Sequence, residues 1–171
     1  KMDITYLEGV QKTVSFFSPD GLKHTGITSM TFPSTLKEIT DFSAYGSYIK
    51  EVLLSHTRVQ EIQSYAFSDS KELENVELPK TLIKIGANAF SGCLDLRFLN
   101  LQMTSVKDIE SDAFKNSGLE SIIFNPGLKI IGDNAFEGTR LTRVQVPRDT
   151  YIGDNAFPPN CRIIRIPNLR F

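Results

Sequence analysis

The segment LKIIGDNAFEGTRLTRVQVP, residues 128–147, is one copy of a unit that recurs along most of the chain. In this copy Ile131 stands five residues before the aromatic residue of an Ala-Phe pair, Ala135-Phe136. The same spacing holds for four other pairs: Ala66-Phe67, Ala89-Phe90, Ala113-Phe114 and Ala156-Phe157. Successive phenylalanines are 21 to 24 residues apart, and Ala44-Tyr45 is an earlier, less regular copy. A repeat of this length predicts a solenoid of the leucine-rich-repeat kind.

A second pattern, apolar-x-x-apolar-x-apolar, follows each Ala-Phe pair. Its last two apolar positions are two residues apart, which is the spacing of a strand with one buried face. In chain order these positions hold Met30/Phe32, Val52/Leu54, Val76/Leu78, Leu99/Leu101, Ile122/Phe124, Val144/Val146 and Ile164/Ile166. We therefore predict seven strands in register, which form a parallel sheet along one side of the solenoid.

Small polar residues precede three of the Ala-Phe pairs: Gly86-Ala87-Asn88, Gly132-Asp133-Asn134 and Gly153-Asp154-Asn155. Such residues favour a turn that leads into a single helical turn. The alanine lets this turn approach the sheet, and the aromatic residues are expected to stack over six rungs as an internal spine. The predicted fold is an α/β solenoid with a parallel sheet of about seven short strands on one face and short helical turns and loops on the other.

The repeat also divides the chain. Residues 1–26 do not follow it and are predicted to form an atypical N-terminal rung or cap, while residues 27–167 form one continuous repeat domain. Residues 168–171 are a tail, which either folds over the last rung or continues into further repeats in the natural chain. The second alternative is favoured because a solenoid needs its open ends covered.

The overall composition is that of an ordinary globular protein. The chain has 171 residues, 40% hydrophobic residues and a net charge of -1. This balance argues against a general nucleic-acid binder, and no apolar run is long enough for membrane insertion. The two cysteines, Cys93 and Cys161, are predicted to lie three rungs apart, roughly 14 Å, which is too far for a disulfide. Cys161 falls in the first inward column and is predicted to be buried.

No combination of residues predicts catalysis, a cofactor or a metal site. His24 and His56 lie in loop-like segments with no partner at the spacing of a metal site or a catalytic triad. Gly132-Asp133-Asn134 and Gly153-Asp154-Asn155 lack the further oxygen ligands that a calcium loop requires. The sequence therefore predicts a protein that is not an enzyme.

The residues that alternate with the buried columns point outward and are the candidates for a binding surface. Phe98 and Ile123 fall on neighbouring strands in the middle of this face, where a purely solvated surface would be polar. The alternative is that β-strand propensity and cross-strand packing account for them. We predict that Phe98, Ile123 and Leu53 are apolar anchors for a partner.

Charge is distributed unevenly along the predicted face. Glu51, Glu72, Glu74 and Glu77 make the early rungs acidic, and six arginines make residues 138–171 basic. Arg143 and Arg165 are predicted to point outward and to orient the partner, which would be an acidic protein or a polyanionic glycan. Ordinary solvated arginines are the alternative.

The unit resembles the leucine-rich repeats of the BspA-like (Bacteroides surface protein A type) family. The resemblance is carried by Ile85-Gly86, Ala89-Phe90-Ser91-Gly92-Cys93, Ile131-Gly132 and Ala135-Phe136-Glu137-Gly138, and it covers about residues 27–167. Residues 39–45 depart from the pattern, since they lack the glycine and are one residue longer. The resemblance implies a right-handed, curved horseshoe, a location at the cell surface or outside the cell, and a host or matrix protein as partner.

These observations lead to one main hypothesis, a non-enzymatic protein-recognition or adhesion module that binds through the outward face of its sheet. The alternatives are a structural spacer that projects another domain and a glycan-binding accessory domain. A spacer would bind nothing tightly, whereas an accessory domain would bind glycans without turnover.

Overall fold

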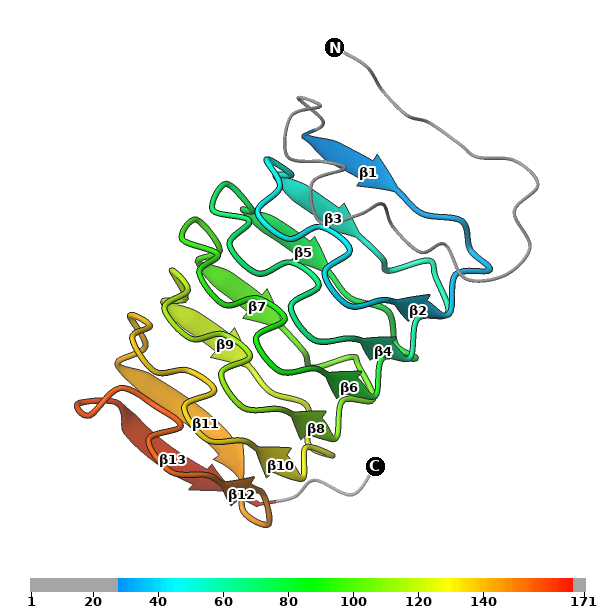
Figure 1. Cartoon of the computed structure of the whole chain (residues 1–171). Helices are drawn as coiled ribbons and strands as arrows, with labels where there is room; N and C mark the ends of the chain where they lie inside the picture. The colour runs from blue at the N-terminus through cyan, green and yellow to red at the C-terminus, as the bar shows by residue number, and fades with distance from the viewer. Residues whose placement is uncertain (1–27, 168–171) are drawn as a thin grey trace.

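The computed structural model describes residues 28–167. The predicted N-terminal cap (1–26), Ile27, and the tail (168–171) lie outside the described residues. Within them the chain winds into a parallel β-solenoid whose strands form two rows (Figure 1). All the regular elements of residues 28–167 are strands. This part of the chain accordingly has no helix that is long and apolar enough to cross a membrane.

The first row confirms the seven strands that the alternating pattern predicts. The strands are β1 (Ser29–Thr31), β3 (Glu51–Leu53), β5 (Asn75–Glu77), β7 (Phe98–Asn100), β9 (Ser121–Ile123), β11 (Arg143–Pro147) and β13 (Arg162–Ile166). Parallel hydrogen bonds join β1-β3-β5, β7-β9 and β11-β13, and β5 and β9 also lie in contact with β7 and β11, respectively. Within β1-β3-β5 and within β7-β9 the inward residues align as predicted, with Val52 beside Val76 and Leu99 beside Ile122.

The second row contains the isoleucines that precede the turns. It is a six-stranded parallel ladder of two-residue strands: β2 (Glu38–Ile39), β4 (Glu61–Ile62), β6 (Lys84–Ile85), β8 (Asp108–Ile109), β10 (Ile130–Ile131) and β12 (Tyr151–Ile152). In each of the first five the isoleucine is fully buried. The sequence predicts only helical turns and loops here, because two residues are too few to show a period.

The predicted helical turns are wrong, and the backbone shows why. Asn88 and Asn134 have φ values of 56° and 55°, and Gly92 and Gly138 follow four residues later with φ of 71°. Left-handed residues at this spacing interrupt helical geometry. The amide of Phe90 bonds across to the next rung (Ala113 O, 2.8 Å) instead of back along its own turn. Hydrogen bonding between rungs therefore replaces hydrogen bonding within a helix.

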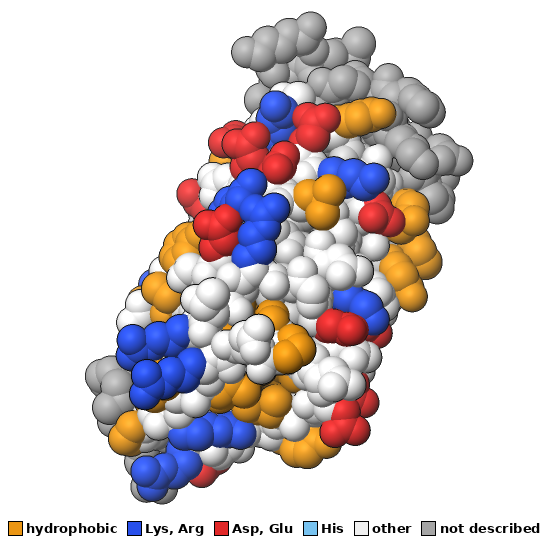
Figure 2. Space-filling model, turned by 90° about the vertical axis from the view of Figure 1, so that its left-hand side faces the viewer, with side chains coloured by type: hydrophobic (Ala, Val, Ile, Leu, Met, Phe, Trp, Pro, Cys, Tyr) orange, Lys and Arg blue, Asp and Glu red, His pale blue; other side chains and the backbone are white. Residues whose placement is uncertain are grey.

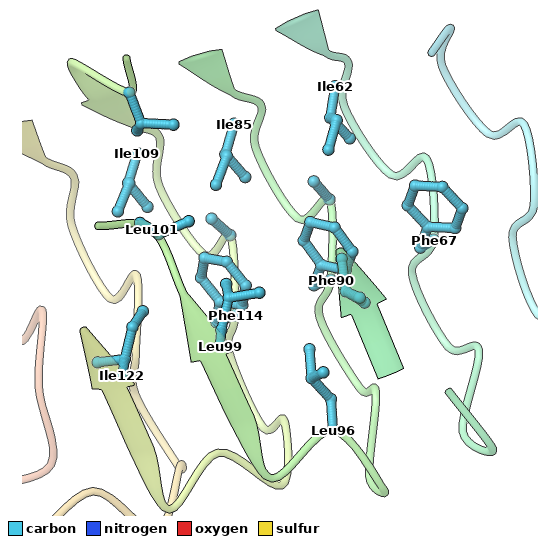
Figure 3. Packing of buried hydrophobic residues seen from close by; sticks show 14 of the residues in the cluster. Ile62, Phe67, Ile85, Phe90, Leu96, Leu99, Leu101, Ile109, Phe114 and Ile122 are labelled. Atoms are coloured by element: carbon cyan, nitrogen blue, oxygen red, sulfur yellow. The ribbon is translucent and has the colours of Figure 1, made fainter. Parts of the chain in front are cut away.

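The phenylalanines of the Ala-Phe pairs form a continuous stack through the core. Figure 3 shows three of them, Phe67, Phe90 and Phe114. Phe67, Phe90, Phe114, Phe136 and Phe157 lie parallel, with ring centroids of neighbours 5.1 to 5.3 Å apart. The four that precede Phe157 are almost completely buried. Because parallel strands of neighbouring rungs are also about 5 Å apart, one ring fits on each rung without distorting the ladder.

The first described turn departs from the predicted alignment. The amide of Ala44 donates to Ala66 O of the next rung at 2.7 Å. In the next rung the equivalent hydrogen bond is made by the amide of Phe67, which donates to Ala89 O at 2.8 Å. Ala44 therefore takes the place of a phenylalanine, and half-buried Tyr45 lies outside the stack. The predicted sixth aromatic layer and the predicted extra residue are both wrong, because the bonds between rungs set the alignment.

A column of small, mostly polar side chains is buried in the turns, and the repeat pattern did not predict it. Three residues after each position of the stack, except the last, stand Ser47, Ser70, Cys93, Ser117 and Thr139, and all are buried. The Ser47 and Ser70 hydroxyls lie 3.0 Å apart, and Cys93 Sγ donates to Phe67 O at 3.2 Å. Both Cys93 and Cys161 are free thiols, as predicted.

The last strand, β13, is shifted by one residue from the predicted register. The alternating pattern aligns Ile163 with Arg143, but in the structure Arg162 is the partner of Arg143 and Arg165 is the partner of inward-facing Val146. The link from Phe157 to this strand is two residues shorter than the link from Phe136 to β11. Cys161, predicted to be buried, is half-buried as a result.

Candidate functional site

The outward side chains of the seven long strands form one continuous surface, which we call the sheet face. In β5, β7 and β9 the residues alternate as exposed, buried and exposed; in β7 these are Phe98, Leu99 and Asn100. The alternation follows from the pleat of a strand, which sends successive side chains to opposite sides. Binding residues on this face can therefore vary while the core stays constant.

Three large apolar side chains lie exposed near the middle of the sheet face, and we call them the apolar centre. Phe98 is 49% exposed, Ile123 40% and Met103 67%. Phe98 and Ile123 belong to the paired strands β7 and β9, where Asn100 is the direct partner of Ile123. They are thus diagonal neighbours, a distance that long and aromatic side chains can span.

Met103 connects two hollows of this surface. The larger, about 600 Å³, we call the C-terminal groove; its lining consists of Gln102, Met103, Ile122, Ile123, Phe124, Pro126, Arg143, Val144, Gln145, Ile166 and Pro167. The smaller, about 330 Å³, includes Phe98, Asn100 and Glu77 in its lining and again Met103. Both predicted central anchors therefore line a concave site, one in each hollow.

The repeat pattern did not predict a role for Met103. It stands in the loop that follows β7, outside the alternation that defines outward positions. One signal could have found it, since the corresponding loop residues of two other rungs are polar, His56 and Lys80. An apolar residue at a loop position is unusual enough to predict a surface role.

The charges on the sheet face are separated along the solenoid. Figure 2, which views the left-hand side of Figure 1, shows several Asp and Glu side chains together with some Lys and Arg near the N-terminal end, and a group of Lys and Arg side chains toward the C-terminal end. Glu51, Glu74 and Glu77 are exposed, and none forms an ion pair within residues 28–167. Glu72 differs, because it lies 3.7 Å from Lys50 Nζ. A partner of matching polarity would be oriented as well as attracted.

An ion-pair bridge crosses the boundary between the apolar centre and the basic end. Glu120 Oε1 lies 2.5 Å from Arg97 Nη1 and 3.3 Å from Arg140 Nη1. Arg97, and to a lesser extent Arg140, lowers the pKa of the Glu120 carboxyl. All three side chains are well exposed, so the bridge contributes more to orientation than to stability.

The predicted binding residues do not all meet in one place. Ile123 and Arg143 line the C-terminal groove together, and Phe98 lies beside it across Met103. Leu53 is half-buried on β3, three rungs from Ile123 in the same column. It is absent from the lining of both hollows, so the structure does not bring it to the apolar centre.

Arg165 was predicted to lie on the sheet face, and this is wrong. The shifted register of β13 places it beside inward-facing Val146 at the end of the solenoid. Its guanidinium donates to Pro147 O at 3.2 Å and to Thr150 O at 2.7 Å. Arg165 therefore satisfies carbonyl groups at the end of the last described rungs.

A second charged cluster lies on the row of short strands. Lys84 Nζ lies 2.8 Å from Glu110 and 3.2 Å from Glu61, and these bonds raise the pKa of its ammonium group. Burial, and then Glu110, raise the pKa of the nearby Asp108 carboxyl. Glu61 and Glu110 are already paired with Lys84. In residues 28–167 no three His, Cys, Asp or Glu side chains are arranged to hold a metal ion.

The parallel solenoid, its internal phenylalanine stack and its varied outward face define a leucine-rich-repeat protein. A family model described as the BspA type leucine rich repeat region matches the chain in six copies, over residues 10–117 and 45–165. The chain belongs to the BspA type leucine-rich-repeat family. Repeats of this class generally serve as protein-interaction modules and typically form non-enzymatic scaffolds.

One solved structure supports the same fold. A crystal structure of a leucine-rich repeat protein from Bacteroides ovatus ATCC 8483 is similar to this chain, with a TM-score of 0.50 and 25% sequence identity. The similarity covers 77% of this chain but only 29% of that protein. The comparison with curated proteins finds no match.

Proposed function

We propose that this domain is a protein-recognition module that binds its partner through the sheet face, with the apolar centre as the anchor. The observation that carries the proposal is the exposure of Phe98, Met103 and Ile123 together, beside two hollows. Exposed glutamates lie on the strands toward the N-terminal side of this cluster, and exposed arginines lie on the strands toward the C-terminal side. Exposed apolar clusters that are rimmed by polar residues mark interaction sites. Large apolar anchors near the centre of an interface carry most of its binding energy.

An adhesive role at the cell surface or outside the cell is part of the proposal. It is supported by the resemblance to surface proteins and by the membership of the BspA type family. Antibody labelling of intact and permeabilised cells tests it. Labelling that requires permeabilisation contradicts the location.

The binding proposal is tested with a partner selected from a displayed library of extracellular protein fragments. The variant Phe98→Ala with Ile123→Ala should weaken binding about 10- to 100-fold, because each change removes an anchor of the interface. The matched control is Ile83→Ala with Ile130→Ala, because these side chains are exposed to a similar degree but are not part of the sheet face.

Both variants should keep the parent's unfolding midpoint, because all four side chains are substantially exposed. Equal loss of binding in the two variants would remove the sheet face from consideration. If the library yields no partner that depends on Phe98 and Ile123, a structural spacer becomes the better account.

A further inference from the structure

Two arginines are partners on neighbouring strands, and one of them, Arg143, lines the C-terminal groove. Arg143 of β11 and Arg162 of β13 are direct partners in the strand register, and paired residues of neighbouring strands lie about 5 Å apart. Both are exposed, and neither forms an ion pair within residues 28–167. Like charges directly opposite each other destabilise a sheet. An anion held between the two guanidinium groups would remove this repulsion.

Two other arginines near this end already have partners. Arg140 joins the bridge at Glu120, and Arg165 donates to two backbone carbonyl groups. Arg143 differs from both, because it forms no ion pair within residues 28–167 and because it lines the C-terminal groove together with Ile123 and Gln145. The uncompensated charge therefore lies at the edge of an apolar hollow.

The lining of the groove favours one kind of anion. Met103, Ile123 and Phe124 offer apolar surface, which gains free energy when another apolar side chain covers it. A sulfated glycan would match the charge of the arginines but would leave this apolar surface uncovered. A peptide that combines apolar and acidic side chains satisfies both.

We propose that the C-terminal groove binds an extended acidic peptide segment of a partner protein. One apolar side chain of the segment lies between Met103 and Ile123, and a carboxylate lies between Arg143 and Arg162, where the planar guanidinium groups bind it in a bidentate manner. This inference rests on the proposed function. The exposed glutamates of the early rungs, such as Glu51 and Glu77, repel the same segment, which sets its direction along the sheet face.

The probe is a fluorescein-labelled synthetic peptide that contains two leucines followed by three glutamates. Two matched peptides carry lysines in place of the glutamates or serines in place of the leucines. Fluorescence anisotropy should show that the whole chain binds the leucine-glutamate peptide about tenfold more tightly than either matched peptide, and that this binding weakens as salt is added. Equal affinity for the glutamate and lysine peptides would overturn the proposal.

The variant Arg143→Gln with Arg162→Gln should weaken binding of the leucine-glutamate peptide about tenfold, since exposed charge pairs each contribute a few-fold. Arg148→Gln is the control, because it removes the charge of another exposed arginine of the same end that is not part of the pair. A loss in Arg148→Gln as large as in the double variant would show a general charge effect and would overturn the specific site.

Other occupants give different results. Tighter binding of a heparin fragment than of the leucine-glutamate peptide would assign the groove to a polyanion, and self-association that the double arginine variant abolishes would assign it to a second copy of this chain. Either result overturns the proposal. If a selected partner loses affinity in Phe98→Ala/Ile123→Ala but not in Arg143→Gln/Arg162→Gln, the proposed function stands and the acidic-segment inference fails.

Discussion

The middle rungs of the solenoid keep the spacing of the repeat, whereas the first and last described rungs depart from it. In the middle, Phe90, Phe114 and Phe136 each lie between two parallel rings. At the first described turn an alanine, Ala44, takes this place. At the last strand the register has moved by one residue. Within residues 28–167, each middle rung is flanked by two described rungs that hold its register, and the departures occur in the first and last described rungs.

The largest expected difference in stability is between substitutions of Phe114 and Tyr45, two aromatic residues at the same position of the sequence repeat. Phe114→Ala should lower the free energy of unfolding by about 3–5 kcal/mol, because it leaves a cavity between two stacked rings. Tyr45→Ala should lower it by about 1 kcal/mol or less, because Tyr45 is half-buried outside the stack. Chemical denaturation measures both values. Equal losses would contradict the placement of Ala44 in the stack.

The two cysteines extend the contrast to reactivity. Cys93 is fully buried in a middle rung, where burial raises the pKa of its thiol far above the usual range. Cys161 is only half-buried near the end, where burial also raises its thiol pKa. A thiol reagent should modify Cys161 at least about 100-fold faster than Cys93 in the native protein, since Cys93 must wait for local opening. Comparable rates, read by peptide mass spectrometry, would show that the middle opens as readily as the end.

The next largest expected effect is a loss of stability on substitution of Gly138, a glycine in one of the turns. Gly138 has a φ of 71°, and a Cβ there would lie 2.1 Å from Asn116 Oδ1 of the preceding rung. Gly138→Ala should destabilise the protein by about 1–2 kcal/mol, through backbone strain and displacement of Asn116. Gly127→Ala is the control, because its Cβ would meet no atom closer than 3.1 Å. Thermal unfolding of the two variants should separate them clearly.

The smallest effect concerns the ion-pair bridge at the boundary between the middle and the basic end. Arg97 and then Arg140 lower the pKa of Glu120 in the folded chain. The bridge therefore stabilises the fold above the unfolded pKa of about 4.3, and this contribution disappears as the pH falls through the lower folded value. Glu120→Gln should remove a small part of the acid dependence of stability and leave stability at pH 7 nearly unchanged. An unaltered acid profile would mean that the bridge contributes nothing measurable.

The sequence alone determined the number of long strands, the buried columns and the phenylalanine stack from Phe67 to Phe157. These features depend on local periods of two residues and about 22 residues, which a single chain displays directly. Phe98, Ile123 and Arg143 were placed correctly on the sheet face because outward positions alternate with buried ones in strands held on both sides.

Only the tertiary structure decided the register of the two ends, the short strands and the surroundings of the groove. Ala44 takes a ring's place because bonds between rungs set the alignment, and the shift of β13 places Arg162, not Ile163, beside Arg143. Met103 belongs to the apolar centre because of the path of its loop, which has no periodic pattern. A periodic pattern specifies which residues are buried, but the length of each link and the neighbouring rung decide which exposed residues meet.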